Sequence, residues 1–178
     1  GSGAVDTQSF TITVANVNDA PTVTSTAITS KTEDSAYSYT FAASDVDSGD
    51  SVTYAATTLP SWLSFNAGTG VLSGTPTNAD VGNHSVVLTA TDSNSAVSTQ
   101  SFTLTVSNVN DAPTITTTAS TAINTLSPYS YTFAASDVDS GDTVTYAATT
   151  LPSWMSFNAG TGVLSGTPAY SNIGNHSV

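Results

Sequence analysis

Carboxylates cluster at two places in the chain. The stretch FAASDVDSGD at residues 41–50 carries Asp45, Asp47 and Asp50, and the same ten letters recur at residues 133–142. Two carboxylates at positions i and i+2 of an extended segment lie on one face, roughly 7 Å apart. At an effective dielectric constant near 20, their repulsion costs about 2 kcal/mol unless a cation neutralises it. The spacing therefore predicts a cation site.

The oxygen donors near these carboxylates are of the kind that calcium prefers. Ca²⁺ takes several oxygen ligands from Asp, Glu, Asn and backbone carbonyl groups and tolerates irregular geometry. Asp45 and Asp47 offer such oxygens, as does the pair Asn18-Asp19. DVDSGD is not an EF-hand, because Asp50 stands at the sixth loop position and Ala56 at the twelfth, where Gly and Glu are needed.

The alternative to a metal site is an ordinary turn. Asp, Ser and Gly all favour turns, and Asp side chains bond to their own backbone two residues further on. This alternative applies most strongly to Asp50, Asp142 and Asp80.

Charge composition restricts the partners. The 178 residues include 13 acidic residues and a single basic residue, Lys31, for a net charge of −12. A single lysine does not neutralise a phosphate backbone, so nucleic acid and anionic membrane surfaces are not expected as partners. No apolar run approaches the roughly 18 residues that cross a bilayer, so no membrane insertion is expected. The chain has no Cys and two His, which excludes a Cys/His transition-metal site.

The sequence repeats itself at an offset of 92 residues. Residues 41–76 and 133–168 differ at two positions only, and AVDTQSFTITVANVNDAP at 4–21 is matched by residues 96–113. Such periodicity is typical of tandem arrays. We therefore expect a window onto a longer array, divided into the terminal strand and linker of a preceding repeat (1–20), a complete repeat (21–113) and a truncated repeat (114–178).

Short alternating segments predict strands. Tyr37, Tyr39 and Phe41 alternate with Ser and Thr, no segment has a helical period, and residues 66–70 carry a hairpin turn signal. About seven such segments fall in each repeat. The predicted fold class is all-β, with tandem antiparallel seven-stranded β-sandwiches of Ig-like or cadherin-like kind.

Three motifs in a fixed order carry a family resemblance. LPSWLSFNAGTGVLSGTP (59–76), VVLTATDSNS (86–95) and TVSNVNDAP (105–113) together resemble the bacterial cadherin-like repeats of the dystroglycan type, an Ig-like family, over essentially the whole chain. The resemblance implies calcium-binding sandwiches in large secreted or surface proteins, including adhesins, some of which accompany polysaccharide-degrading enzymes. It implies a secreted or cell-surface location.

The resemblance also implies a set of calcium ligands at each junction between repeats. The junction before the complete repeat would use Asn18, Asp19, Asp45, Asp47 and Asp92. The junction after it would use Glu33, Asp80, Asn110, Asp111, Asp137 and Asp139. The linker departs from the cadherin pattern DxNDN at both ends, so we expect fewer ions per junction. The last copy has Asn172 in place of Asp80 and no acid in place of Glu33, so its far end should bind calcium weakly or not at all.

These observations favour a calcium-rigidified extracellular spacer or adhesin repeat that holds distal domains away from a surface. Its partners would be neighbouring repeats of the same chain. One alternative is a carbohydrate-binding module that uses Trp62 and Trp154 against a polysaccharide or cell-surface ligand, although buried core is the expected place for these residues. Another is a homophilic adhesion domain. His84 has no nucleophile nearby, so no catalytic residue and no enzyme activity are predicted.

The ends of the chain lead to one further expectation. The truncated copy lacks its final strand, which leaves open sheet edges, and residues 4–16 form a final strand without a domain of their own. We expect residues 4–16 either to lie unpaired or to complete the truncated copy of another molecule by strand complementation.

Overall fold

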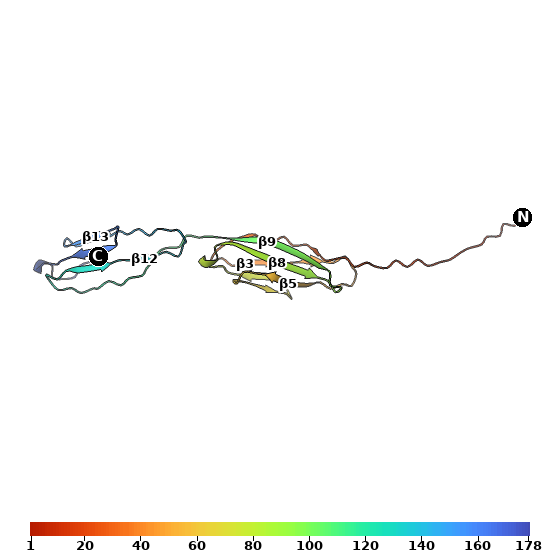
Figure 1. The fold of residues 1–178 in the computed structure, drawn as a ribbon, viewed down its shortest axis with the longest axis horizontal. Coiled ribbons are helices and arrows are strands. Elements are labelled where there is room, and N and C mark those ends of the chain that lie inside the picture. The colour runs from red at the N-terminus through yellow and green to blue at the C-terminus, as the bar shows by residue number, and fades with distance from the viewer. The chain divides into compact units, whose positions relative to one another are not determined.

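The computed structural model describes all residues from Gly1 to Val178, and its regular structure is β-strand apart from two 3-10 turns (Figure 1). The chain divides into two compact units, residues 1–107 and residues 108–178. Residues 1–20 are exposed and belong to no strand. The all-β prediction is confirmed, whereas the predicted boundaries at residues 20 and 113 stay a prediction.

The first unit contains two main sheets. The larger has the order β2 (Ser30–Thr32), β9 (Val97–Ser107), β8 (Gly82–Thr91) and β5 (Thr53–Thr58). The smaller has the order β3 (Tyr37–Thr40), β7 (Val71–Gly74) and β6 (Leu63–Asn66). A separate pair joins β1 (Thr22–Val23) to β4 (Ala43–Ser44), and the 3-10 turn η1 spans Asn78–Asp80. Figure 1 shows β8 and β9 side by side along most of this unit.

One pairing departs from the predicted antiparallel pattern. β2 runs parallel to β9, with Lys31 opposite Val106. The first two strands of the unit have different partners, since β1 pairs with β4 and β2 pairs with β9. An alternating pattern indicates which face of a strand is buried but not which neighbour it finds, so the sequence did not predict this pairing.

The core of the first unit lies between its sheets. Tyr37, Tyr39 and Phe41 are buried while the intervening Ser38 and Thr40 are exposed, as the alternation predicts. Leu72 on β7 packs into the same cluster. Aromatic rings meet edge to face within it, with the Phe41 and Tyr54 centroids 5.3 Å apart.

The hairpin predicted at residues 66–70 connects β6 to β7. Asn66 Oδ1 accepts hydrogen bonds from the N–H groups of Gly68 at 3.0 Å and Thr69 at 3.2 Å. Gly70 has φ +70°, and a Cβ there would clash with the Phe41 carbonyl oxygen. This turn therefore requires glycine at its last position.

The second unit repeats the smaller sheet and lacks the larger one. Its strands are β10 (Thr114–Ile115), β11 (Tyr129–Thr132), β12 (Ala135–Ser136), β13 (Met155–Asn158) and β14 (Val163–Gly166), followed by η2 (Tyr170–Asn172). Tyr129 lies opposite Gly166, as Tyr37 lies opposite Gly74. Residues 145–150 match β5 in sequence but form no strand, because β5 pairs with β8 and only residues 174–178 of the second unit correspond to β8.

The core assignment can be tested at Leu72, whose side chain is 0% exposed. Leu72→Ala should lower the free energy of unfolding of the first unit by about 2–5 kcal/mol, because it leaves a cavity between packed strands. Ser38→Ala on the exposed face of β3 is the control and should change it by less than about 0.5 kcal/mol. Urea denaturation measures both, and equal effects of the two substitutions would contradict this core.

Candidate calcium site

The loop after β4 gathers three carboxylates in the first unit. Asp45 Oδ1 accepts a hydrogen bond from the Asp47 N–H at 2.8 Å, and the Asp50 N–H donates to the Asp47 carbonyl at 3.3 Å. Gly49 has φ +98°, which allows the tight return of the loop. One carboxylate oxygen from each of Asp45, Asp47 and Asp50 lies within 4.8 Å of the others. Two oxygens bound to one Ca²⁺ lie at most about 5 Å apart, so a single ion could contact all three carboxylates.

One oxygen in this cluster has no partner. Asp45 Oδ2 is buried and makes no hydrogen bond. A buried carboxylate oxygen without a donor or cation is costly. The residues present therefore fit a bound cation better than a plain turn, in which this oxygen would face water or a backbone N–H.

The segment that leads into the first unit is fastened to this loop through Asp47. Asp47 Oδ1 accepts a hydrogen bond from Asn16 Nδ2 at 2.9 Å, and Asp47 Oδ2 accepts one from the Asp19 N–H at 2.7 Å. Both oxygens of one carboxylate thus hold the linker. The predicted ligands Asp19 and Asp47 meet directly.

Asp92 holds the same linker from a second loop. It follows β8, and its Oδ1 accepts hydrogen bonds from the N–H groups of Asn94 at 2.9 Å and Ala96 at 2.8 Å. Its Oδ2 accepts one from Asn18 Nδ2 at 2.8 Å. The Asn18 bond, followed by those from the turn backbone, lowers the pKa of Asp92 against the opposing effect of burial. Asp92 therefore keeps its negative charge beside the linker.

Asp50 belongs to the cluster rather than to the turn alone. Its Oδ1 accepts a hydrogen bond from Ser93 Oγ at 2.8 Å, and its Oδ2 accepts one from Asn94 Nδ2 at 3.2 Å. The Asn94 amide also donates to Asn18 Oδ1. Sequence reasoning did not single out Ser93 and Asn94. The run DSNS directly after a predicted strand was the available signal, since it is typical of an Asx turn.

The second unit repeats the bond between linker and loop. The Asp111 N–H donates to Asp139 Oδ2 at 2.7 Å, and the Asp139 N–H donates to Asp137 Oδ1 at 3.0 Å. Asn110 Nδ2 donates to the Asp111 carbonyl at 3.0 Å. Asp137, Asp139 and Asp142 each offer an oxygen within 4.8 Å of the others. The 178 residues include no counterpart of Asp92 in this unit.

Asp80 has a local structural role. Its Oδ2 accepts hydrogen bonds from the Thr77 N–H at 2.9 Å and from Thr77 Oγ1 at 2.8 Å, and these bonds lower its pKa. Asn172 caps η2 in the same way, by accepting a bond from the Ala169 N–H at 2.8 Å. This cap needs an oxygen and not a charge. The role of Asp80 as a calcium ligand stays a prediction.

Glu33 lies directly after β2. Its backbone N–H donates to the Ser107 carbonyl at 3.0 Å, which places it at the end of β9. Asp92 and the linker lie at the opposite end of the first unit, near Ser98. Glu33 therefore does not join the cluster around Asp47, and its role as a ligand stays a prediction.

The two tryptophans pack inward. Trp62 is half-buried, with its ring edge to face with Tyr37 at 6.3 Å and with His84 at 5.9 Å. Trp154 stands in the same relation to His176 at 5.8 Å. The indole Nε1 atoms of both are buried. This packing favours the core assignment over an open platform for a sugar ring.

Comparison with known proteins agrees with the fold. A family model described as "Putative Ig domain" matches residues 20–107 and 112–178. No curated protein matches the chain.

No helix in the structure has the length and apolar character needed to span a bilayer.

Solved structures of two cadherins and of one hydrolase are similar to the chain. Human CDH23 EC21-23 is 20% identical with a TM-score of 0.51, over 89% of this chain and 57% of that one. The Protocadherin GammaB4 extracellular domain is 25% identical with a TM-score of 0.48, over 90% of this chain and 31% of that one. The endo-fucoidan hydrolase MfFcnA4 is 21% identical with a TM-score of 0.41, over 86% and 25%. The chain spans less than two thirds of each of these proteins. The family match covers most of the chain, which therefore belongs to this Ig-like family and has a cadherin-like fold.

Proposed function

We propose that the chain is a calcium-binding extracellular repeat that acts as a stiff spacer in a surface or secreted protein. The observation that supports this proposal is the linker of the first unit. Asn16, Asn18 and Asp19 are bound to the carboxylates of Asp47 and Asp92, beside the unpartnered oxygen of Asp45. The linker residues that lead into the first unit are thus hydrogen-bonded to the carboxylates that could hold a cation.

The ligands proposed for the first unit are oxygens already close to the linker. Asp45 Oδ2 would contribute the oxygen that lacks a partner, and Asp47 and Asp50 would each contribute a carboxylate. Asn18 and Asp92 would extend the set from the linker and from the loop after β8. Calcium accepts such mixed sets of carboxylate and amide oxygens and completes its shell with water.

Calcium would supply charge neutralisation at this site. Three carboxylates within 4.8 Å repel one another, and one divalent ion removes most of that repulsion. The linker then loses its freedom to swing, because its own side chains and the loop share an ion. In tandem arrays each repeat contacts only its neighbours, so the stiffness of the linkers determines the stiffness of the array.

The second unit repeats the linker and loop residues of the site. Asn110, Asp111, Asp137 and Asp139 repeat the linker and loop residues, and Asp142 repeats Asp50. We propose that Asp137, Asp139 and Asp142 supply the carboxylates of this site. Glu33 and Asp80 are proposed as further ligands on the family resemblance alone.

A secreted or cell-surface location is part of the proposal. Extracellular calcium modules typically bind with dissociation constants on the order of 10⁻⁴–10⁻³ M, which suits a secreted or cell-surface protein and not a cytosol poor in calcium. Neighbouring repeats of the parent protein are the proposed partners. A carbohydrate-binding role loses support because Trp62 packs against Tyr37 and His84.

The ion can be tested by calorimetric unfolding in calcium and in chelator. At a free calcium concentration about 100-fold above the dissociation constant, one site should stabilise the first unit by about 2.7 kcal/mol. For a domain of this size that is a rise of roughly 10 °C or more in Tm. Asp47→Asn should remove most of the rise, because it deletes the carboxylate that holds both the linker and the cluster.

Asp6→Asn is the matched control for Asp47→Asn. It makes the same change in net charge at an exposed N-terminal position outside the cluster. It should keep the full calcium-dependent rise in Tm. If Asp6→Asn and Asp47→Asn reduced the rise equally, calcium would be acting on net charge and the proposed site would be wrong.

The pKa of Asp92 predicts a pH dependence in chelator. Because this pKa is lowered from 3.8 in the folded state, ionised Asp92 stabilises the fold at neutral pH. The stabilisation is complete above about pH 5 and disappears as the pH falls through the lowered pKa. The difference in Tm between wild type and Asp92→Asn should therefore be largest at neutral pH and shrink toward pH 2. A difference that is constant from pH 7 to pH 2 would show that the charge of Asp92 does not stabilise the linker.

A further inference from the structure

Strands β2 and β9 of the first unit run side by side in the same direction. β2 pairs with the last three residues of β9, Thr105–Ser107. At one end of this contact the Thr105 N–H donates to the Thr29 carbonyl at 2.9 Å. At the other end the Glu33 N–H donates to the Ser107 carbonyl at 3.0 Å. The parallel contact therefore extends from residue 29 to residue 33.

The chain enters the first unit at one end of β9 and leaves it at the other. Near the start of β9, Ser98 Oγ donates to the Pro21 carbonyl. The chain then reaches β2 beside the far end of β9, and β9 itself ends at Ser107. These two ends are roughly 30 Å apart along the strand. Tension applied through the flanking linkers therefore pulls β2 and β9 in opposite directions along their common axis.

A pull along this axis strains all the hydrogen bonds between β2 and β9 at the same time. The strands can slide apart only if these bonds break together, whereas a pull across the strands breaks them one after another. On its other side β9 is held more firmly, because it forms ten residue pairs with β8 and only three with β2. The contact between β2 and β9 therefore determines the tension at which the unit opens.

Side chains fasten the segment between β1 and β2, residues 24–29, which forms no strand. Gln100 on β9 donates from Nε2 to the Ser25 carbonyl at 2.9 Å, and its Oε1 accepts a hydrogen bond from the Tyr39 hydroxyl at 2.6 Å. The Tyr39 hydroxyl lies 2.7 Å from Ser25 Oγ. The Tyr37 hydroxyl donates to the Ile28 carbonyl at 2.8 Å. The entering chain is thus bound to β3 and β9 before it reaches β2.

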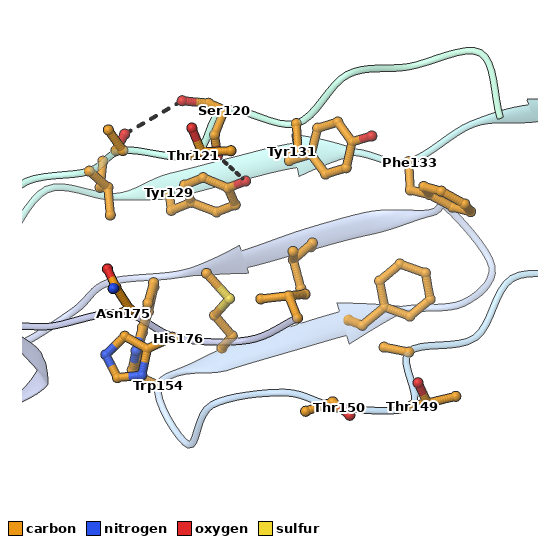
Figure 2. A pocket seen from close by; sticks show the side chains of 18 of the residues that line it. Ser120, Thr121, Tyr129, Tyr131, Phe133, Thr149, Thr150, Trp154, Asn175 and His176 are labelled. Atoms are coloured by element: carbon orange, nitrogen blue, oxygen red, sulfur yellow. Dashed lines mark hydrogen bonds between the residues drawn. The ribbon is translucent and has the colours of Figure 1, made fainter.

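The tyrosine bonds recur at the matching positions of the second unit. Figure 2 shows the bond from the Tyr129 hydroxyl to the Ser120 carbonyl, which is 2.9 Å long. The Tyr131 hydroxyl lies 2.8 Å from Thr117 Oγ1, and Thr117 keeps the hydroxyl that Ser25 supplies in the first unit. These bonds are therefore a feature of the repeat and not of one copy.

We propose that the parallel contact between β2 and β9, together with the Gln100 side chain, is a mechanical clamp that keeps the repeat folded under tension along the chain. The inference rests on the proposed spacer function only for the source of the tension. It involves no calcium and is tested in chelator. A failed clamp would therefore be distinguishable from a failed calcium site, which is tested by the rise in Tm.

Single-molecule pulling in two directions tests the clamp in a chain that has no cysteine of its own. Handles coupled to the reduced thiols of Ala20→Cys and Asn108→Cys pull along β9. Handles on Ala36→Cys and Asn108→Cys, which both lie just beyond the clamp, peel β2 from β9. All three positions are exposed. At equal force the folded unit should survive about tenfold longer or more in the first direction, because several hydrogen bonds must break together.

Gln100→Ala tests the side chain in both pulling directions. It should shorten the lifetime about tenfold in the pull along β9, since it removes two hydrogen bonds from the strained segment. In the peeling direction β2 detaches before this segment is strained, so the lifetime should hardly change. Thr99→Ala, at an exposed neighbouring position on β9, is the control and should change neither lifetime.

Two results would contradict the clamp. Equal lifetimes in the two pulling directions, without the Gln100 substitution, would overturn the proposal. A loss of lifetime on Gln100→Ala that is equal in both directions would show that Gln100 supports the fold in general, and would overturn its role in the clamp.

Discussion

The bond between the Asp47 carboxylate and the linker is the constraint on which the arrangement of the first unit's entry depends. One carboxylate accepts hydrogen bonds from Asn16 Nδ2 and from the Asp19 N–H, so the chain enters the domain in a fixed direction. One carboxylate oxygen of Asp45 and one of Asp50 lie within 4.8 Å of an Asp47 oxygen. The three negative charges repel one another, so this loop conformation is unfavourable without a cation. The repulsion within the loop and the unpartnered Asp45 Oδ2 are the two features that support the proposed cation.

The same arrangement occurs twice because the sequence repeats. Asp111 and Asp139 reproduce the bond that joins Asp19 to Asp47, with the same 2.7 Å separation. What differs is the sheet that supports it. In the first unit the loop after β8 brings Asp92 to the linker, whereas the second unit has no residues that match this loop.

Much of the candidate site could be predicted from spacing and repetition. Asp45, Asp47, Asn18 and Asp19 were predicted because carboxylates and amides recur at one phase of a 92-residue period. In the structure Asp19 and Asp45 are both hydrogen-bonded to Asp47, whereas Asn18 is bonded to Asp92. Asn94 and Ser93 were missed because they reach Asp50 from a loop 43 residues away, and no local pattern encodes that approach. The alternation of apolar and polar residues predicted where strands occur and which face of each strand is buried. It did not predict the parallel pairing of β2 with β9.

The central claim is that one calcium ion joins the linker to the loop after β4. Anomalous diffraction from crystals grown with calcium tests it most directly, because it locates the ion independently of any change in shape. We expect a peak within about 2.6 Å of Asp45 Oδ2 and of a carboxylate oxygen of Asp47. Crystals saturated with calcium that show no peak at this position, while Asp45 Oδ2 stays without a partner, would contradict the account.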